Sequence, residues 1–249
     1  MTDVLALLRD DELSPTRPAY AYCMVLACVE ARRCRYESVV VAEFGVAWGE
    51  GLRELARIAP LVSDGLGSEV SVVGFDRGGL PAPRDRRDHP EIWHENQFSN
   101  ESLDELVAEL AGRAEFVVGD LADTVGPFAA SLSRSRPLGA VLLDVDLYSS
   151  ASEALSVLDV ADPACYLPAM PLYADDVGEL LTYNARCGEA LAIAEHNQAS
   201  EHRFIEHKPV RVGWPSQRWH EKIYVCHVLD HPVRSAGAAE ALEISVDRY

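Results

Sequence analysis

The segment Val39–Gly51 constrains the fold more than any other part of the chain, because its pattern changes within a few residues. An apolar, β-branched run ends at Glu43 and Phe44, a glycine-spaced turn follows, and helical periodicity begins at Leu52. A strand, a tight turn and a helix in this order form the first unit of a doubly wound α/β sheet. In such sheets ligands bind at the carboxyl ends of the strands.

The composition of this turn favours a cationic ligand over a diphosphate. A dinucleotide fold has G-x-G-x-x-G directly after the strand and binds pyrophosphate at the helix N-terminus. This turn instead has Gly45, Gly49 and Gly51, and it carries Glu50 at the start of the helix. A carboxylate there interacts well with the helix dipole, but it repels a diphosphate. A buried glycine-rich turn without any ligand is the alternative.

The pattern Glu43-x-Gly45-x-Ala47-x-Gly49 resembles motif I, E/D-x-G-x-G-x-G, of the class I S-adenosylmethionine-dependent methyltransferases. The cofactor of that family is a sulfonium with an amino-acid tail and no phosphate. The middle glycine of the motif is Ala47 here, which makes the turn less permissive. The resemblance implies that Glu43, Gly45 and Gly49 belong to a binding site for S-adenosylmethionine.

The rest of the chain alternates between strand and helix patterns. Apolar runs bounded by turn residues predict strands at 38–44, 69–75, 114–118, 140–146, 167–174, 202–207 and 222–229. Helical periodicity predicts a first helix at 19–35 and a last one at 180–200. The alternation predicts an α/β fold, a Rossmann-like doubly wound seven-stranded sheet that is mostly parallel with an antiparallel last strand.

We expect a single methyltransferase-like domain over residues 1–249. Within it, residues 1–37 are predicted to form an N-terminal helical lead-in, 77–100 a candidate lid loop and 233–249 a C-terminal tail. The tail is rich in alanine and acidic residues, and it packs as a terminal helix or contributes to a homo-oligomer.

The charge of the chain argues against whole classes of partner. It has 40 acidic and 22 basic residues, for a net charge of −18. Nucleic acids and anionic membranes both attract basic surfaces, so we expect neither as a partner. The six cysteines form no C-x-x-C pair, and no signal peptide or membrane-spanning stretch is recognisable. We expect a soluble, cytoplasmic protein with reduced, buried thiols.

Acidic residues follow the second and third predicted strands. Asp76 lies where a carboxylate accepts hydrogen bonds from the two hydroxyls of a ribose; the alternative is a surface aspartate that caps the loop. Asp120 lies where the methyltransferase fold often has an acidic residue that contacts adenine. Alternatively, it caps the helix that begins at Leu121.

Residues 77–100 form a connection longer than a plain strand-to-helix loop requires, and they are rich in proline, glycine and charge. One interpretation is a lid or substrate loop in which Trp93 and His94 contact the substrate. The other is a surface loop pinned by a buried Trp93.

Four aspartates follow the fourth and fifth predicted strands. Asp144 and Asp146 are two residues apart, a spacing that puts side chains on the same face of a strand. Asp175 and Asp176 end the next strand. Like charges at one edge of a sheet raise each other's pKa, and a hard divalent cation such as Mg²⁺ neutralises them. The alternative is a set of capping and loop aspartates that point apart.

The segments Leu143–Ser150 (LDVDLYSS) and Tyr173–Val177 (YADDV) are similar to the metal-dependent macrocin-type sugar O-methyltransferases of antibiotic biosynthesis. Those enzymes have an Asp-x-Asp-x-Tyr segment after the fourth strand and an Asp-Asp pair after the fifth. The resemblance covers residues 39–177. Arg17-Pro-Ala-Tyr20 also resembles a segment of a broader bacterial methyltransferase-like group.

This resemblance implies a site and a reaction. Asp144, Asp175 and Asp176 would hold Mg²⁺ or another hard divalent cation, and Asp146 would be the general base. The reaction would transfer a methyl group from S-adenosylmethionine to a hydroxyl of a sugar or natural-product intermediate. A metal that binds the hydroxyl lowers its pKa and fixes its position.

Other functions stay open at this point. One alternative is an N-methyltransferase with the same fold and cofactor. Another is a protein that binds the cofactor but has altered or lost its transfer chemistry. A nicotinamide-dependent oxidoreductase is a more distant alternative, because Glu50 and the absence of G-x-G-x-x-G argue against it. His220 is the histidine to test as a rival base.

Overall fold

The structure is a computed structural model of the chain, and it describes residues 16–178, 180–210 and 217–235. The first fifteen residues of the expected N-terminal lead-in lie outside the described residues. The same holds for most of the expected C-terminal tail, from residue 236 onward.

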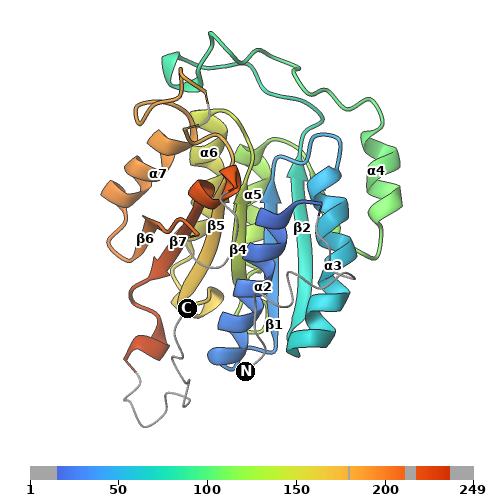
Figure 1. Cartoon of the computed structure of the whole chain (residues 1–249), viewed down its shortest axis with the longest axis vertical. Helices are drawn as coiled ribbons and strands as arrows, with labels where there is room; N and C mark the ends of the chain where they lie inside the picture. Colours follow the sequence, from blue (N-terminus) through green and yellow to red (C-terminus); the bar gives the residue numbers. More distant parts are fainter. Residues whose placement is uncertain (1–15, 179, 211–216, 236–249) are drawn as a thin grey trace.

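Within the described residues, seven strands form one sheet with the order β3-β2-β1-β4-β5-β7-β6 (Figure 1). The strands are β1 (Ser38–Phe44), β2 (Glu69–Asp76), β3 (Glu115–Val118), β4 (Leu138–Leu143), β5 (Ala169–Ala174), β6 (Arg203–His207) and β7 (Ile223–Val228). The first five strands run parallel, and β7 pairs antiparallel with both β5 and β6. The predicted seven-stranded, Rossmann-like sheet with an antiparallel last strand is confirmed.

Helices cover both faces of this sheet. They are α2 (Pro18–Arg33), α3 (Glu50–Leu66), α4 (Leu103–Leu110), α5 (Leu121–Ser131), α6 (Tyr148–Leu155) and α7 (Gly188–Ala199). In Figure 1, α2 and α3 lie in front of the strands, and α5 and α6 lie behind them. In the sheet β1 lies between β2 and β4, so the chain builds β2 and β3 on one side of β1 and then crosses to build β4 and β5 on the other. Ligands of doubly wound sheets bind at such a switch point.

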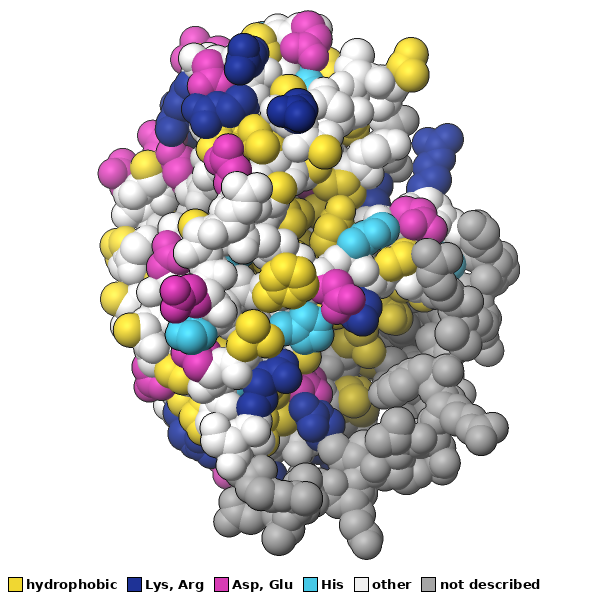
Figure 2. Space-filling model, turned by 90° about the vertical axis from the view of Figure 1, so that its left-hand side faces the viewer, with side chains coloured by type: hydrophobic (Ala, Val, Ile, Leu, Met, Phe, Trp, Pro, Cys, Tyr) yellow, Lys and Arg dark blue, Asp and Glu magenta, His cyan; other side chains and the backbone are white. Residues whose placement is uncertain are grey.

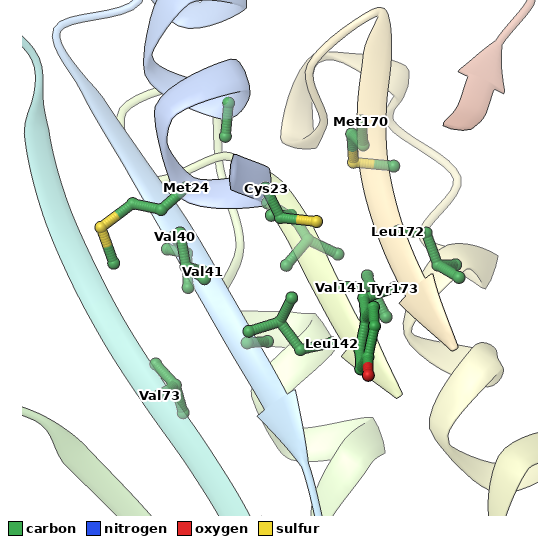
Figure 3. Close-up of a cluster of buried hydrophobic side chains, with 14 of the residues drawn as sticks. Cys23, Met24, Val40, Val41, Val73, Val141, Leu142, Met170, Leu172 and Tyr173 are labelled. Atoms are coloured by element: carbon green, nitrogen blue, oxygen red, sulfur yellow. The ribbon is translucent and has the colours of Figure 1, made fainter. Parts of the chain in front are cut away.

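The core lies between α2 and the central strands (Figure 3). Cys23 and Met24 of α2, Val41 of β1 and Leu142 of β4 are all completely buried. Fully burying a large aliphatic side chain contributes about 1.5–3 kcal/mol, so these strands form a rigid base for the loops at their carboxyl ends. All six cysteines are free, and five of them are buried.

Strand β4 ends earlier than the sequence predicts. The predicted strand covers 140–146, but β4 ends at Leu143, and Asp146 has a left-handed backbone with φ of 61°. The backbone N–H of Val145 donates to the Glu189 carboxylate instead of to a neighbouring strand. The sequence predicts that Asp144 and Asp146 lie on the same face of a strand. This prediction is wrong, because both residues follow the end of β4 and their side chains project from a loop.

Charged side chains of both signs are mixed on the surface. On the face shown in Figure 2, basic side chains are scattered among acidic ones and form no continuous basic area in the part drawn in colour. In the described ranges, every helix is too short or too polar to cross a membrane.

Candidate functional site

A cavity of about 400 Å³ opens at the carboxyl ends of β1, β2, β3 and β4. Ligand pockets of roughly 300–1,000 Å³ hold small molecules and cofactors. The predicted site residues that line this cavity are Gly45, Asp76, Asp120, Asp144 and Asp146. Residues from four separate segments of the chain therefore meet at one place, on the side of the sheet where this fold binds ligands.

The glycine-spaced turn after β1 packs directly against the loop after β4. Gly45 has a φ of +89°, and a Cβ at this position would lie 1.8 Å from the carbonyl oxygen of Asp144. Only glycine fits there. Ala47, which replaces the middle glycine of motif I, has a φ of 47°, a conformation that costs a side-chain-bearing residue about 1–2 kcal/mol. The turn after β1 therefore has the backbone conformation expected of motif I, although Ala47 is less favourable there than glycine.

Asp76 holds this turn in place. Its Oδ2 accepts hydrogen bonds from the backbone N–H groups of Val46 (2.8 Å) and Ala47 (2.7 Å). Its Oδ1 accepts one from Gly78 N–H at 2.6 Å, which is the loop-capping contact named as the alternative. An ionised carboxylate has about four acceptor sites, so Asp76 retains capacity for a further donor. Its role at a ribose stays a prediction.

The other predicted cofactor residues differ in their positions. Asp120 lines the cavity, pairs with Arg77 at 2.9 Å and makes no side-chain cap to α5. Gly49 begins α3 as its N-cap and does not line the cavity. Glu43 is 1% exposed, and burial raises its pKa well above the usual range. A Cβ added at Gly51 would lie 2.1 Å from Glu43 Oε1, so Glu43 packs closely against the first turn of α3.

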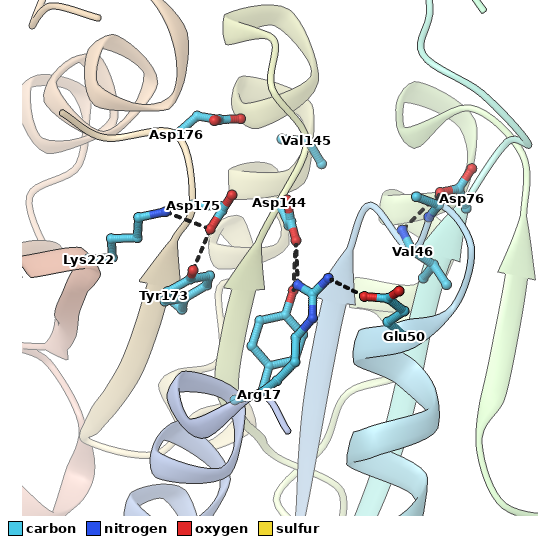
Figure 4. Close-up of polar contacts among 12 residues, drawn as sticks. Arg17, Val46, Glu50, Asp76, Asp144, Val145, Tyr173, Asp175, Asp176 and Lys222 are labelled. Atoms are coloured by element: carbon cyan, nitrogen blue, oxygen red, sulfur yellow. Dashed lines mark hydrogen bonds and ion pairs between the residues drawn. The ribbon is translucent and has the colours of Figure 1, made fainter. Parts of the chain in front are cut away.

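Asp144, Asp175 and Asp176, which follow β4 and β5, lie at one edge of the sheet (Figure 4). Burial, and then the nearby Asp175 carboxylate, raise the pKa of Asp144. Burial, and then the Asp176 carboxylate, raise the pKa of Asp146. The four carboxylates lie close enough to affect one another's pKa.

Asp144 is held by residues from the start of α2. Its Oδ2 accepts hydrogen bonds from the Tyr20 hydroxyl at 2.9 Å and from Arg17 Nη1 at 3.2 Å. The Arg17 guanidinium also lies 3.6 Å from a carboxylate oxygen of Glu50. The ring of Tyr20 packs in the core, while its hydroxyl reaches the site.

Asp175 and Asp176 have separate partners. The Lys222 ammonium lies 2.8 Å from Asp175 Oδ1, and the Tyr173 hydroxyl donates to the same oxygen. The Tyr183 hydroxyl donates to Asp176 Oδ1 at 2.5 Å. Neither Asp175 nor Asp176 lines the cavity itself. In Figure 4 both lie beside the loop after β4 that carries Asp144 and Val145.

Glu189 is a site residue that the sequence does not reveal. Its completely buried carboxylate accepts hydrogen bonds from the backbone N–H groups of Val145 (3.2 Å) and Asp176 (3.0 Å). It thereby joins the loops after β4 and β5. The predicted helix over 180–200 places Glu189 in its middle, whereas α7 begins at Gly188. The one sequence feature that could have located Glu189 is Gly188 directly before it, because α7 begins at this glycine and Glu189 then lies in the first helical turn.

The arrangement of these side chains does not fit the predicted metal site. Asp144 and Asp175 are already paired with Arg17 and Lys222. Among the residues that the structure describes, no group of three or more His, Cys, Asp or Glu side chains could hold a metal ion. The assignment of Asp144, Asp175 and Asp176 to Mg²⁺ stays a prediction that this donor set does not support.

The rival base does not belong to the cavity. His220 lies in η4 (Arg218–Lys222), and burial lowers its pKa. It is absent from the residues that line the cavity, whereas Asp146 lines it. Of the two predicted candidates for the base, only Asp146 therefore lies at the cavity.

The segment 77–100 runs over the carboxyl ends of the strands (Figure 1) and forms one wall of the cavity through Leu80, Pro81 and Phe98. Trp93 is buried in a small cluster with Leu80 and Leu147, and His94 is exposed. Neither Trp93 nor His94 lines the cavity. The interpretation in which a buried Trp93 pins the loop agrees with these contacts.

Asp88 fastens the same segment to α6. It is 1% exposed, its Oδ1 accepts from Ser149 N–H at 2.7 Å, and its Oδ2 accepts from Ser149 Oγ and Arg84 N–H. The N-cap of α6 is Leu147, which has no side-chain acceptor. Asp88 therefore caps α6 from another segment of the chain, and its charge lies favourably at a helix N-terminus.

We expect Asp88→Asn to lower the free energy of unfolding by about 2 kcal/mol, because a buried, charge-assisted set of hydrogen bonds is broken. Limited proteolysis within residues 77–100 should become faster. The matched control is Glu95→Gln, an exposed carboxylate in the same segment, which should change stability by less than about 0.5 kcal/mol. Equal stability of the two variants would contradict the capping role.

Comparisons with known proteins identify the fold. No protein-family model matches the chain, and no curated protein matches it. The solved structure of CalS11, a calicheamicin methyltransferase, matches with a TM-score of 0.53 and 17% identity over 90% of this chain and 89% of that one. A structure of the plantazolicin methyltransferase BpumL in complex with SAH matches with a TM-score of 0.43 and 9% identity, over 90% and 88% of the two chains. The chain has the Rossmann-like methyltransferase fold.

Proposed function

We propose that this chain is an S-adenosylmethionine-dependent methyltransferase that methylates a hydroxyl of a small molecule, a sugar or a natural-product intermediate. The observation that carries the proposal is the cavity in the methyltransferase fold, where Gly45, Asp76 and Asp120 meet Asp144 and Asp146. CalS11, which has the same fold, is a calicheamicin methyltransferase, and a natural-product acceptor here agrees with that likeness.

The residues that line the cavity could bind the ribose, the adenine and the sulfonium of this cofactor. Asp76 would accept from the ribose hydroxyls, and Asp120 would contact the adenine. The sulfonium would then lie near the carboxylates of Asp144 and Asp146, whose negative charge attracts a cation. The exposed Glu50 at the start of α3 disfavours a diphosphate, which is the reason to place an oxidoreductase second.

The proposed reaction is an in-line displacement. The acceptor oxygen forms a bond to the methyl carbon, the carbon–sulfur bond breaks, and its electron pair stays on sulfur. The hydroxyl proton goes to Asp146, whose side chain lines the cavity. Holding the two reactants in line supplies much of the acceleration. A hydroxyl needs such a proton acceptor more than a neutral amine does, which favours O-methylation.

We expect Asp76→Asn to weaken binding of S-adenosylhomocysteine by tenfold or more, equivalent to about 1.4 kcal/mol. The amide removes one acceptor oxygen and loosens the turn that Val46 and Ala47 form. Calorimetric titration measures the Kd. Asp104→Asn, at an exposed position on α4, is the control and should bind like the wild type. Unchanged affinity in Asp76→Asn would place the adenosine elsewhere.

The position of the transferred methyl group separates the remaining alternatives. The protein is incubated with methyl-labelled S-adenosylmethionine and a panel of nucleotide sugars, glycosides, catechols and amines, and the products are analysed by NMR. Label on oxygen supports the proposal, and label on nitrogen favours the N-methyltransferase. Tight cofactor binding without transfer to any compound indicates lost or altered chemistry.

A further inference from the structure

A buried lysine lies where the resemblance to metal-dependent enzymes would place a metal ion. The Lys222 side chain is 6% exposed, and its ammonium lies 2.8 Å from Asp175 Oδ1. Only two of the 249 residues are lysines. Burial of an ammonium is strongly unfavourable unless a carboxylate pairs with it, so Asp175 and Lys222 form one unit in which the charge of the carboxylate is already balanced.

A second cation reaches the same carboxylates from the opposite end of the chain. Arg17 precedes the first residue of α2 and lies 3.2 Å from Asp144 Oδ2. Figure 4 shows Arg17 and Lys222 on either side of the pair formed by Asp144 and Asp175. Two positive side chains therefore face two carboxylates, the same number of charges that one divalent ion provides.

The lone pairs of the carboxylates are occupied as well. Each of the three predicted metal ligands accepts a hydrogen bond from a tyrosine hydroxyl. The donors are Tyr20 to Asp144, Tyr173 to Asp175 and Tyr183 to Asp176. A divalent ion would have to displace these donors and lie beside two fixed cations. Both effects oppose its binding.

We propose that Lys222, together with Arg17, supplies from within the chain the positive charge that the predicted divalent ion would provide, so that the carboxylates after β4 and β5 bind no metal ion. Lys222 is then a positioning residue that orients Asp175 beside the cavity. Given the proposed function, methyl transfer proceeds without an added metal. The statement about ion binding does not depend on that function.

The test measures binding of Mn²⁺ directly, by electron paramagnetic resonance of the free ion. The wild type should bind no stoichiometric Mn²⁺ at millimolar concentration. Lys222→Ala, which opens space and frees a lone pair on Asp175, should gain one site with at least about tenfold tighter binding than the wild type. Adding Asp175→Asn to this variant should abolish the gain.

Lys208→Ala is the matched control. Lys208 also pairs with a carboxylate, that of Glu206 at 3.1 Å, but it is half exposed. Its replacement should leave Mn²⁺ binding unchanged. Circular dichroism and the Kd for S-adenosylhomocysteine report whether each variant is folded.

The proposal is overturned if the wild type binds one Mn²⁺ that Asp175→Asn loses, or if folded Lys222→Ala gains no site. Should Lys222→Ala not fold, the comparison of wild type with Asp175→Asn decides alone: absence of stoichiometric Mn²⁺ in both supports the proposal. Failure of the proposed function is recognised separately, by the absence of binding of S-adenosylhomocysteine to the wild type.

Discussion

Asp146→Asn is expected to lower kcat for methyl transfer by about 10²–10⁴-fold, the usual contribution of a general base. The carboxylate lines the cavity. Asparagine has the same shape and tolerates the left-handed backbone, φ 61°, that this residue adopts. The loop should therefore keep its conformation, and the Kd for S-adenosylhomocysteine should change by no more than a few-fold.

The control for this variant is Asp159→Asn, an exposed aspartate at the end of η2 (Ser156–Asp159) that makes the same change in charge. Its kcat should equal that of the wild type. Steady-state rates measured with a labelled methyl donor give both values. Full activity of Asp146→Asn would remove Asp146 from the reaction and require another proton acceptor.

Gly45→Ala is expected to lower the free energy of unfolding by roughly 3 kcal/mol or more. The added Cβ would have a left-handed φ of +89° and would lie 1.8 Å from the carbonyl oxygen of Asp144, so the turn and the loop after β4 must separate. For a chain of this size the Tm should fall by about 6–12 °C. Binding of S-adenosylhomocysteine should be lost, because both segments line the cavity.

Gly67→Ala separates backbone strain from steric overlap. Gly67 also has a left-handed φ, +70°, but nothing lies within 4 Å of a Cβ added there. It ends α3, and the substitution should cost only about 1 kcal/mol with cofactor affinity unchanged. Similar losses of stability and affinity in the two variants would contradict the close contact between the turn and the loop.

The fold could be predicted because each strand is an apolar run that is recognisable from neighbouring residues alone. β1 has the predicted bounds, Ser38–Phe44, since a run of valines is bounded by a polar residue and a turn. The position of Asp76 and Asp120 at the cavity follows from the general property that strand ends share one edge. The end of β4 was not predictable, because Leu143–Asp146 continues an alternating pattern, and only the buried Glu189 shows where pairing stops.

The partners of the carboxylates could not be predicted for a related reason. The argument for Mg²⁺ considers only the aspartates after β4 and β5. The balancing charges come from residues 17 and 222, more than forty residues away from the aspartates they contact. No local pattern indicates that a lysine before the last strand, or an arginine before the first helix, turns toward this site.

The most direct test of the central claim is calorimetric titration of the wild-type protein with S-adenosylhomocysteine and, separately, with NAD⁺. The account predicts one bound S-adenosylhomocysteine per chain and no heat of binding with NAD⁺, because the cavity ends in carboxylates and the helix after β1 begins with Glu50. Binding of NAD⁺ without binding of S-adenosylhomocysteine would contradict it.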